Sequence, residues 1–285
     1  MDRQRSAYPG PSAVVYPLTA LISDLHGNVP ALDVALADAR ERGVERVVCL
    51  GDMVGYGAQP RECLERVMQL ASDRARELGL QPGLCLKGNH EHALLNTAED
   101  FNPNARRAIE WTREALSGGD RERAWALWDY LGSLEAWGLE GHVAYAHGSP
   151  RDPVREYLLP RDARDTGKMA ALFGALAERS GGAARVCFVG HSHVPAIYYE
   201  DGRFYRPKDT EGPYDLGDLD AVRALVNIGS VGQPRDGDPR LSYVVFDGQN
   251  LTFVRLDYPV EAAQERIRAV PELPDYLAER LAKGQ

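Results

Sequence analysis

The chain has 285 residues, of which 44% are hydrophobic and 26% are charged, as in compact globular proteins with one large domain or two small ones. Lys and Arg number 33 against 42 Asp and Glu, which gives a formal net charge of -9. An acidic surface disfavours long nucleic acids as partners and is compatible with a site that holds several cations.

The cysteines and the missing targeting signals predict a cytoplasmic protein. The four cysteines have no paired spacing, and three lie inside apolar strand-like runs, so we interpret them as reduced core thiols: Cys49, Cys63, Cys85 and Cys187. A catalytic cysteine is the alternative, and no neighbouring residue supports it. No apolar run is long enough to cross a membrane, and residues 1–6 lack the apolar core of a signal peptide.

The first part of the chain alternates between strand-like and helix-like patterns. Residues 1–16 are rich in Pro, Ser and Arg without periodicity, which predicts a loose terminus. A strand that starts near Leu18 is followed by predicted helices over 28–43 and 60–78 and by predicted strands over 46–50 and 83–86. This order is typical of parallel strands joined by right-handed helical crossovers.

The rest of the chain predicts more helices and then short strands. One helix is predicted over 102–131, and its expected buried residues are Ile109, Leu116, Trp125, Leu127 and Trp128. A hairpin (134–139 and 142–146), a helix (163–178) and a strand (184–189) come next. After Pro195, the turn signals predict short strands in a second, more antiparallel sheet, and residues 206–222 are predicted to be a loop insertion. Residues 259–281 predict a helix interrupted at two prolines.

Polar side chains follow three successive predicted strands. Asp24 and His26 come after the first strand, Asp52 after the second, and Asn89 with His90 after the third. Alternate side chains of an extended segment share a face, so the first two can point into one small volume. In open α/β sheets ligands bind at the carboxyl edge, so we expect these groups to meet there.

The histidines extend this pattern to a candidate metal centre. Five of the seven stand directly after strand-like runs and near glycine: His26, His90, His147, His191 and His193. Carboxylates with imidazoles suit Mn, Fe, Zn, Co or Ni, and the absence of positioned thiols argues against structural zinc or an iron–sulfur cluster. The ligands suffice for two ions, which lie about 3.5–4 Å apart in such sites and need a bridging carboxylate, for which we choose Asp52.

These motifs resemble the five sequence blocks of the calcineurin-like metallophosphoesterases. The blocks are present in order over residues 21–194, as Asp24-X-His26, Gly51-Asp52, Gly88-Asn89-His90-Glu91, His147 and Gly190-His191-X-His193. The stretches 24–28, 51–57, 147–150 and 227–235 resemble the small bacterial and archaeal phosphoesterase branch. The resemblance implies an α/β fold, a four-layer αββα sandwich of two mixed sheets flanked by helices, in a single domain over 1–285.

The resemblance also implies roles for individual residues. One divalent ion would be held by Asp24, His26, Asp52 and His193, and the other by Asp52, Asn89, His147 and His191. Mn is the first choice of metal, with Fe, Zn, Ni or Co as alternatives. His90 would bind phosphate or protonate the leaving oxygen, with Glu91 as its orienting partner.

One departure from the superfamily bears on the substrate. Protein Ser/Thr phosphatases and dinucleoside-tetraphosphate hydrolases carry Asp-Arg-Gly where this chain has Gly55-Tyr56-Gly57, so an arginine that would clamp phosphate is missing. Arg151 or Arg235 could supply charge instead. Because a diester carries less charge, we expect a phosphodiesterase that acts on a small nucleotide-like substrate by attack of a metal-bound hydroxide.

Two other enzymatic functions are compatible with these motifs. A phosphomonoesterase of the protein phosphatase type and a dinucleoside polyphosphate hydrolase are the main alternatives. A binding scaffold without turnover conflicts with the intact ligand set, and a nuclease conflicts with the acidic charge balance. No membrane partner is expected, and self-association is compatible with the sequence.

Three further features have structural interpretations. His92 and His142 are expected at the surface or in support of the ligands. Residues 229–236 are expected to form a structural turn that an Arg235–Asp236 ion pair holds together, with a substrate contact as the less favoured interpretation.

Overall fold

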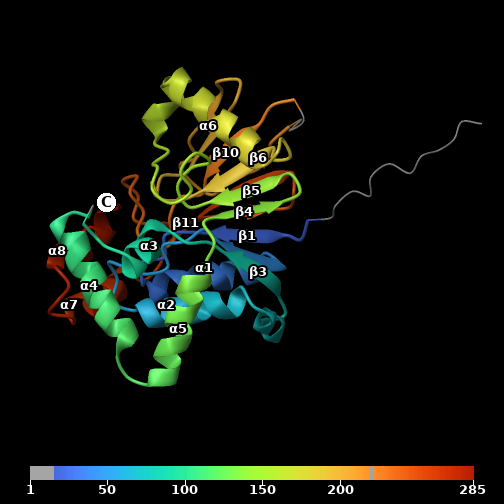
Figure 1. Cartoon of the computed structure of the whole chain (residues 1–285). Helices are drawn as coiled ribbons and strands as arrows, with labels where there is room; N and C mark the ends of the chain where they lie inside the picture. Colours follow the sequence, from blue (N-terminus) through green and yellow to red (C-terminus); the bar gives the residue numbers. More distant parts are fainter. Residues whose placement is uncertain (1–15, 100, 218–220) are drawn as a thin grey trace, which may run out of the picture.

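The computed structural model describes residues 16–99, 101–217 and 221–285. Two six-stranded mixed sheets face each other, and helices cover their outer faces (Figure 1). The strand order is β3-β2-β1-β11-β12-β9 in the first sheet and β4-β5-β6-β10-β7-β8 in the second. The expected four-layer αββα sandwich is thereby confirmed.

Among the described strands, parallel pairing is confined to three neighbouring strands of each sheet, at one edge of the first sheet and in the centre of the second. Strands β1, β2 and β3 are parallel, as are β5, β6 and β10, and antiparallel strands complete both sheets. The first sheet consists of β1 (Thr19–Ile22), β2 (Arg46–Cys49), β3 (Gln81–Cys85), β9 (Glu211–Asp215), β11 (Leu241–Phe246) and β12 (Asn250–Leu256). The second consists of β4 (Trp137–Glu140), β5 (Val143–Ala146), β6 (Val186–Val189), β7 (Ala196–Tyr199), β8 (Phe204–Tyr205) and β10 (Ala224–Asn227).

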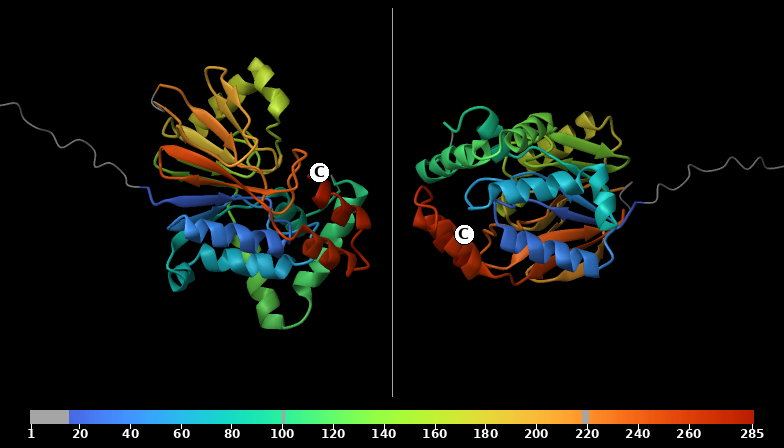
Figure 2. Two further views of the ribbon diagram at one scale, coloured as in Figure 1. Left: turned by 180° about the vertical axis from the view of Figure 1, so that it is seen from behind. Right: turned by 90° about the horizontal axis from the view of Figure 1, so that it is seen from below.

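Most helices cover the first sheet. Figures 1 and 2 show α1, α2 and α5 on its outer face and α6 on the outer face of the second sheet, while α7 and α8 lie beside α4 at one end of the molecule. The helices are α1 (Val29–Glu41), α2 (Pro60–Leu70), α3 (Asn89–Leu95), α4 (Pro103–Ser117), α5 (Arg121–Ser133), α6 (Thr166–Arg179), α7 (Val260–Arg268) and α8 (Asp275–Glu279). Short 3-10 helices are η1 (Asp73–Leu78), η2 (Pro160–Arg164) and η3 (Leu281–Lys283).

Alternation of side chains along the strands builds the layers. Leu21 of β1 and Phe188 of β6 belong to the apolar layer between the sheets. Their neighbours point outward, Ile22 to the helices over the first sheet and Val189 to α6. Each fully buried side chain of this kind contributes roughly 1.5–3 kcal/mol to folding. The strands therefore have two apolar faces, which explains their continuous hydrophobic runs.

The predicted helix over 102–131 is wrong in one respect, because the structure has two helices there. Gly119 has a positive φ of 75°, and Asp120 then caps the amino end of α5. The break changes the phase of the helical face, so Leu127 is buried as predicted whereas Trp125 is 67% exposed. A sequence pattern that continues across a three-residue break cannot reveal this rotation.

Two other helical predictions need correction. The helix predicted to run to residue 78 stops at Leu70, and the 3-10 helix η1 follows after Ser72, whose side chain accepts a hydrogen bond from the amide of Arg74. Helix α3 has no counterpart among the predicted helices, because its seven residues are too few to show a helical periodicity in the sequence. The helix interrupted at prolines is confirmed by α7 and α8.

The strands after Pro195 do not form a separate sheet, so that expectation is wrong. β7, β8 and β10 join β6 in the second sheet, whereas β9, β11 and β12 extend the first sheet from β1. The predicted loop over 206–222 contains β9, which pairs with β12. Turn signals in a sequence predict which neighbouring strands pair, but the choice of sheet depends on long-range contacts.

The amino-terminal prediction can be compared with the structure only at its last residue. Residues 1–15 lie outside the described ranges. Tyr16 is not loose, since its hydroxyl donates to the main-chain oxygen of Glu140 at 2.6 Å and its ring contacts His142 edge to face. Tyr16 therefore links the start of β1 to the hairpin of the second sheet.

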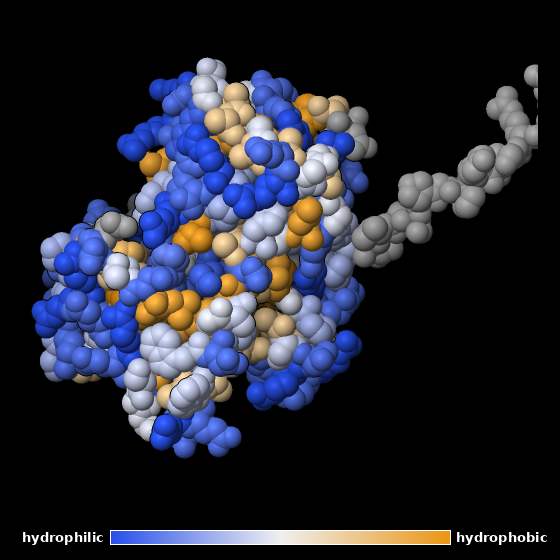
Figure 3. All heavy atoms as spheres, viewed as in Figure 1, coloured by the Kyte–Doolittle hydropathy of each residue, from blue (hydrophilic) through white to orange (hydrophobic). Residues whose placement is uncertain are grey.

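The hydrophilic residues on the surface and the four free cysteines agree with what the composition predicts. Hydrophilic residues cover most of the face shown in Figure 3, with apolar patches between the upper and lower halves. All four cysteines are buried and free. Among the described helices, none is both long and apolar enough to traverse a bilayer.

Candidate metal centre

Strained backbone marks the edge of the two sheets where the predicted ligands lie. Within the described ranges, six residues other than glycine have positive φ angles, and all lie in the turns after β1, β2 and β6: Asp24, His26, Asp52, Tyr56, His191 and His193. Such a conformation costs about 1–3 kcal/mol per residue and persists only where the surroundings enforce it. Its concentration here indicates a functional site.

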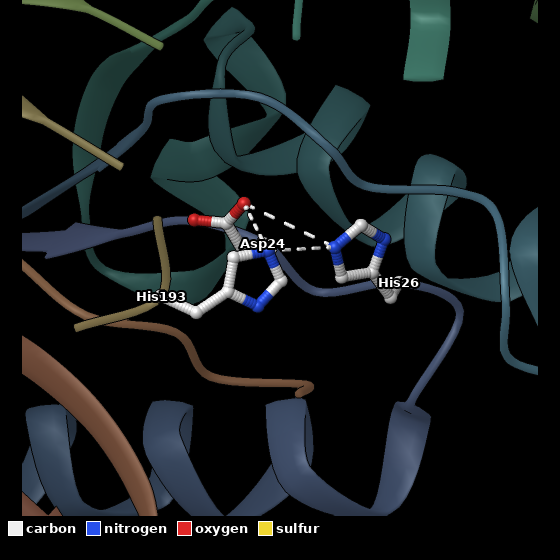
Figure 4. Close-up of side chains that lie close together, drawn as sticks. All are labelled: Asp24, His26 and His193. Carbon is white, nitrogen blue, oxygen red and sulfur yellow. Dashed lines mark hydrogen bonds and ion pairs between the residues drawn. The ribbon is translucent and has the colours of Figure 1, made fainter. Parts of the chain in front are cut away.

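The turns after β1 and β6 bring the first group of ligands together. The Oδ1 atom of Asp24 lies 3.1 Å from Nε2 of His193 and 3.9 Å from Nε2 of His26 (Figure 4). The two Nε2 atoms lie 3.3 Å apart. All three side chains are buried. One carboxylate oxygen and two imidazole nitrogens therefore converge on one point.

A second group forms where β2, α3, β5 and β6 meet. The Oδ2 atom of Asp52 lies 3.4 Å from Nε2 of His147. That nitrogen lies 3.2 Å from Nδ1 of His191 and 3.0 Å from Oδ1 of Asn89. One carboxylate oxygen, one amide oxygen and two imidazole nitrogens thus lie close together beside the first group.

Asp52 lies between the two groups. Its Oδ2 atom is also 3.8 Å from Nε2 of His26 and 3.9 Å from Nε2 of His90. Its Oδ1 atom accepts a hydrogen bond from the amide of His90 at 2.9 Å, which fixes the carboxylate plane. A carboxylate in this position has the geometry that a bridging ligand requires.

The imidazoles are held in the form that binds metal. In each, the ring nitrogen remote from the centre lies beside a main-chain oxygen: Nδ1 of His26 beside Val54 (3.1 Å), Nδ1 of His147 beside Leu50 (3.2 Å), Nδ1 of His193 beside Gln233 (2.5 Å) and Nε2 of His191 beside Arg155 (3.0 Å). A nitrogen that donates to a carbonyl carries the proton, so the nitrogen facing the centre carries a lone pair.

This arrangement fits divalent cations. The facing nitrogens of His26 and His193, and those of His147 and His191, are only 3.3 and 3.2 Å apart, and two lone pairs at that distance repel each other unless a proton or a metal ion lies between them. The Oδ1 atom of Asp24 is buried and has no hydrogen-bond partner. Coordination to a cation satisfies each of these atoms.

Electrostatics support the neutral form for three of these four rings. His147 differs, because the adjacent carboxylate of Asp52 outweighs burial and raises its pKa to about 9, so this ring is protonated near pH 7 until a cation displaces the proton. Burial lowers the pKa of His191 to about 3 and also lowers the pKa of His26 and of His193, so these rings are neutral near pH 7. Burial alone would raise the pKa of Asp24 and of Asp52, but the adjacent imidazoles outweigh it and both carboxyl groups stay ionised.

Glu91 holds the loop of Asp52 rather than the ring of His90. Its carboxylate accepts hydrogen bonds from the amides of Asp52, Met53 and Gly88, each at 2.8 Å. The Nδ1 atom of His90 is buried without a hydrogen-bond partner. The expectation that Glu91 orients the imidazole of His90 is therefore wrong, and its contacts are with the backbone that carries Asp52.

Residues 229–236 support the ligands, as expected of a structural turn. Ser230 Oγ donates to the main-chain oxygen of Asp24 at 2.9 Å, and the Gln233 carbonyl accepts from His193. The expected Arg235–Asp236 ion pair is wrong, because Asp236 pairs with the buried side chain of Arg255. Arg235 instead donates to Oε1 of Gln233 at 2.7 Å and lines the cleft above the centre.

The cleft also contains aromatic and basic residues to which the sequence assigned no role. Phe101, Tyr157 and Arg155 line it together with Tyr56, which belongs to the stretch 51–57. The ring of Tyr157 stacks on His191 with a centroid separation of 3.7 Å. Phe101, Tyr157 and Arg155 carry no motif, so only the fold reveals their proximity.

The remaining predicted residues lie as follows. His92 lines the cleft, and its Nε2 atom is 2.8 Å from Nη2 of Arg155, so it supports the cleft wall. His142 is distant from the centre, beside the main-chain oxygen of Gly248 at 3.0 Å. Arg151 pairs with Glu156 and does not line the cleft.

Comparison with known proteins agrees with the geometry. The calcineurin-like phosphoesterase superfamily domain matches residues 18–251. An uncharacterized protein of Methanocaldococcus jannaschii is 34% identical over 278 residues, which cover 95% of this chain and 100% of that protein. The chain belongs to the calcineurin-like phosphoesterase superfamily.

Two solved structures share the fold. A metallophosphoesterase from Sphaerobacter thermophilus is 37% identical, with a TM-score of 0.74 over 95% of this chain and 100% of that one. A hypothetical protein from Pyrococcus horikoshii, 19% identical, has a TM-score of 0.71 over 94% and 98% of the two chains. As a calcineurin-like phosphoesterase, the protein is a metal-dependent phosphoester hydrolase, and its clustered histidines and aspartates can bind the metal.

Proposed function

We propose that the protein hydrolyses a phosphodiester bond in a small, nucleotide-like substrate at a centre of two divalent ions. The observation that carries this proposal is the pair of ligand groups that share Asp52 beneath an aromatic cleft. One ion would be held by Asp24, His26, Asp52 and His193, and the other by Asp52, Asn89, His147 and His191. When bound, such ions activate water near neutral pH and stabilise charge on phosphoryl oxygens.

The donor set supports Mn first, with Fe, Zn, Ni or Co as alternatives. Carboxylate, amide and imidazole donors suit all of these ions, and geometry and availability select among them. We also propose that the protein acts in the reducing cytoplasm, which the four free cysteines support. Long nucleic acids are not expected as substrates, given the formal charge of -9.

His90 is the proposed proton donor to the leaving oxygen. It lines the cleft, and its Nε2 atom lies 3.9 Å from Oδ2 of Asp52. The imidazole packs between the rings of Tyr56 and Phe101, with centroid distances of 4.5 and 5.1 Å. These rings hold the imidazole in the cleft without taking its hydrogen bonds. Burial lowers the pKa of His90 to about 4, so the ring is neutral in the free protein, and the negative charge of the bound substrate would have to raise this pKa before the ring donates a proton.

The substrate could be a phosphodiester or a more highly charged monoester or polyphosphate. The absence of an arginine from residues 55–57 favours a diester. Arg155 and Arg235 line the cleft, and this observation favours the second candidate, hydrolysis of a more highly charged monoester or polyphosphate. The diester remains our first choice because neither arginine comes from the block that provides the clamp in phosphoprotein phosphatases.

A substrate panel tests the proposal. Bis-p-nitrophenyl phosphate, p-nitrophenyl phosphate, cyclic nucleotides, dinucleoside polyphosphates and phosphopeptides are each assayed with Mn, Fe, Zn, Ni and Co. We expect metal-dependent turnover, with higher kcat/KM for bis-p-nitrophenyl phosphate than for p-nitrophenyl phosphate at matched pH. A clear monoester preference contradicts the diester assignment, and no turnover with any metal contradicts the proposed function.

A further inference from the structure

Two arginines lie beside the cleft, and one of them, Arg235, has no carboxylate partner among the described residues. Its guanidinium donates to Oε1 of Gln233, at 2.7 Å from Nη2 and 3.2 Å from Nε, and is in hydrogen-bond contact with the hydroxyl of Tyr56. Arg280 follows α8 and donates through Nε to the main-chain oxygen of Gln285 at 2.6 Å. Other described arginines, such as Arg61 and Arg113, also donate only to main-chain oxygens, but Arg235 differs from them because it lines the cleft above the metal centre.

The carboxylates nearest in sequence are already paired with other cations. Asp238 binds Arg240, with Nη2 and Oδ2 2.7 Å apart. Asp236 binds the buried Arg255, and Glu279 lies 3.8 Å from Lys283. Asp24 and Asp52 face the imidazoles of the metal centre. Among the described residues, no side-chain carboxylate therefore pairs with Arg235 or Arg280.

The two guanidinium groups lie close to the same tyrosine. The Cζ atoms of Arg235 and Arg280 are 5.7 and 5.6 Å from the centroid of the Tyr56 ring. Burial and the charge of Arg235 lower the pKa of Arg280, as expected for like charges held near one another. Such an arrangement is unfavourable in the free protein and becomes favourable when an anion binds.

Hydroxyl groups complete this region. Tyr56 and Tyr157 line the same cleft as Arg235. A tyrosine hydroxyl can donate a hydrogen bond to an anion. Tyr157 also covers His191, so the basic region adjoins the metal centre.

We propose that Arg235, supported by Arg280 and the two tyrosine hydroxyls, forms a subsite for a second anionic group of the substrate, a phosphate near the phosphorus that reacts. The inference rests on the proposed function and narrows the substrate class to small phosphoesters or phosphoanhydrides with at least two phosphate groups. The metal ions would hold the phosphoryl group that reacts. The arginines would then be available to bind the neighbouring phosphate group of the substrate.

Binding of two product-like anions tests this subsite without turnover. The dissociation constants of inorganic phosphate and of methylenediphosphonate are measured by calorimetry on Mn-saturated protein, with metal content checked afterwards. The wild-type protein is expected to bind the diphosphonate at least tenfold more tightly than phosphate. A charged hydrogen bond contributes enough for about a tenfold change in affinity.

Variants assign the difference to the arginines. Arg235→Gln should weaken diphosphonate binding about tenfold and change phosphate binding less than threefold, and Arg235→Lys should restore part of the loss. Arg280→Gln should weaken diphosphonate binding about two- to threefold, through charge alone. Arg203→Gln is the matched control, because that arginine pairs with Asp201 at an exposed turn, and it should change neither constant.

The outcomes separate this inference from the proposed function. Equal weakening of both ligands in Arg235→Gln would make Arg235 a clamp for the reacting phosphate and overturn the second subsite. Unchanged binding of both would overturn it as well. Hydrolysis of bis-p-nitrophenyl phosphate is measured on the same preparations: its absence in the wild-type protein contradicts the proposed function, whereas normal turnover with an unchanged binding ratio contradicts only the subsite.

Discussion

Each histidine ligand in this site depends on a second group. One ring nitrogen faces the centre, and the second group binds the other ring nitrogen and fixes the orientation of the ring. His193 illustrates this, because its Nε2 atom faces Asp24 while Nδ1 is held by the carbonyl of Gln233. The sequence could predict the facing residues, since each ends a strand-like run. It could not predict the holding groups, which are mostly main-chain oxygens that any residue supplies.

Removal of the imidazole at position 90 tests its proposed chemistry. His90→Ala should keep both metals, since the side chain is not among the proposed ligands. The rate on esters with poor leaving groups should fall roughly 10²–10⁴-fold, and the loss should be smaller for nitrophenyl esters, whose leaving group needs little protonation. Metal content and kcat for a phenyl and a nitrophenyl ester are the measurements. An equal loss on both esters with metals intact would make His90 a phosphate binder instead.

Glu91 offers a stability prediction at the same scale. Its buried carboxylate accepts three amide hydrogen bonds at 2.8 Å, and Glu91→Gln would replace one acceptor oxygen by a donor. We expect the free energy of unfolding, measured in urea, to fall by at least about 2 kcal/mol. The exposed Glu114→Gln serves as control, with a change below about 0.5 kcal/mol. Equal effects of the two substitutions would show that the amide hydrogen bonds to Glu91 contribute nothing to stability.

Among the elements, the turns after the strands position the ligands by close backbone contact. A Cβ atom on Gly88 would lie 2.1 Å from Oδ1 of Asp52, and one on Gly190 would lie 2.7 Å from Oδ2 of Asp24. These glycines allow the turns of one sheet to approach each other and those of the other sheet. The sequence showed glycine beside each ligand, but which atom each one accommodates follows only from the assembled turns.

Gly88→Ala tests this role. The φ of Gly88 is -89°, which alanine adopts freely, so the expected damage comes from the contact with Asp52 alone. We expect lower metal content and loss of most activity. Gly132→Ala is the control, because a Cβ there meets nothing within 4 Å and α5 should gain roughly 0.5–1 kcal/mol. Full metal content in Gly88→Ala would contradict the packing argument.

Elements that depend on local pattern were predicted better than those that depend on distant contacts. The strands β1, β2, β5 and β6 follow from continuous apolar runs, and the ends of these strands carry the site. The assignment of β9, β11 and β12 to the first sheet could not be predicted, because pairing of β11 with β1 joins residues more than two hundred positions apart.

At the scale of the whole molecule, the site lies at the edge where the ends of strands from both sheets meet. The first sheet contributes Asp24, His26, Asp52 and the start of α3, and the second contributes His147, His191 and His193. Removal of metal should therefore weaken the contact between the sheets. We expect apo protein, prepared with a chelator, to unfold at a lower temperature than Mn-loaded protein, by linkage of binding to folding. Identical melting temperatures would indicate that no ion binds the folded protein.

The central claim is a centre of two ions that share Asp52, and metal stoichiometry tests it most directly. Protein saturated with Mn should contain two equivalents by elemental analysis. Asp52→Ala should lower the occupancy of both sites, whereas His26→Ala should chiefly empty one. Saturation of the wild-type protein at one equivalent, or loss of the same single ion in both variants, would contradict the account.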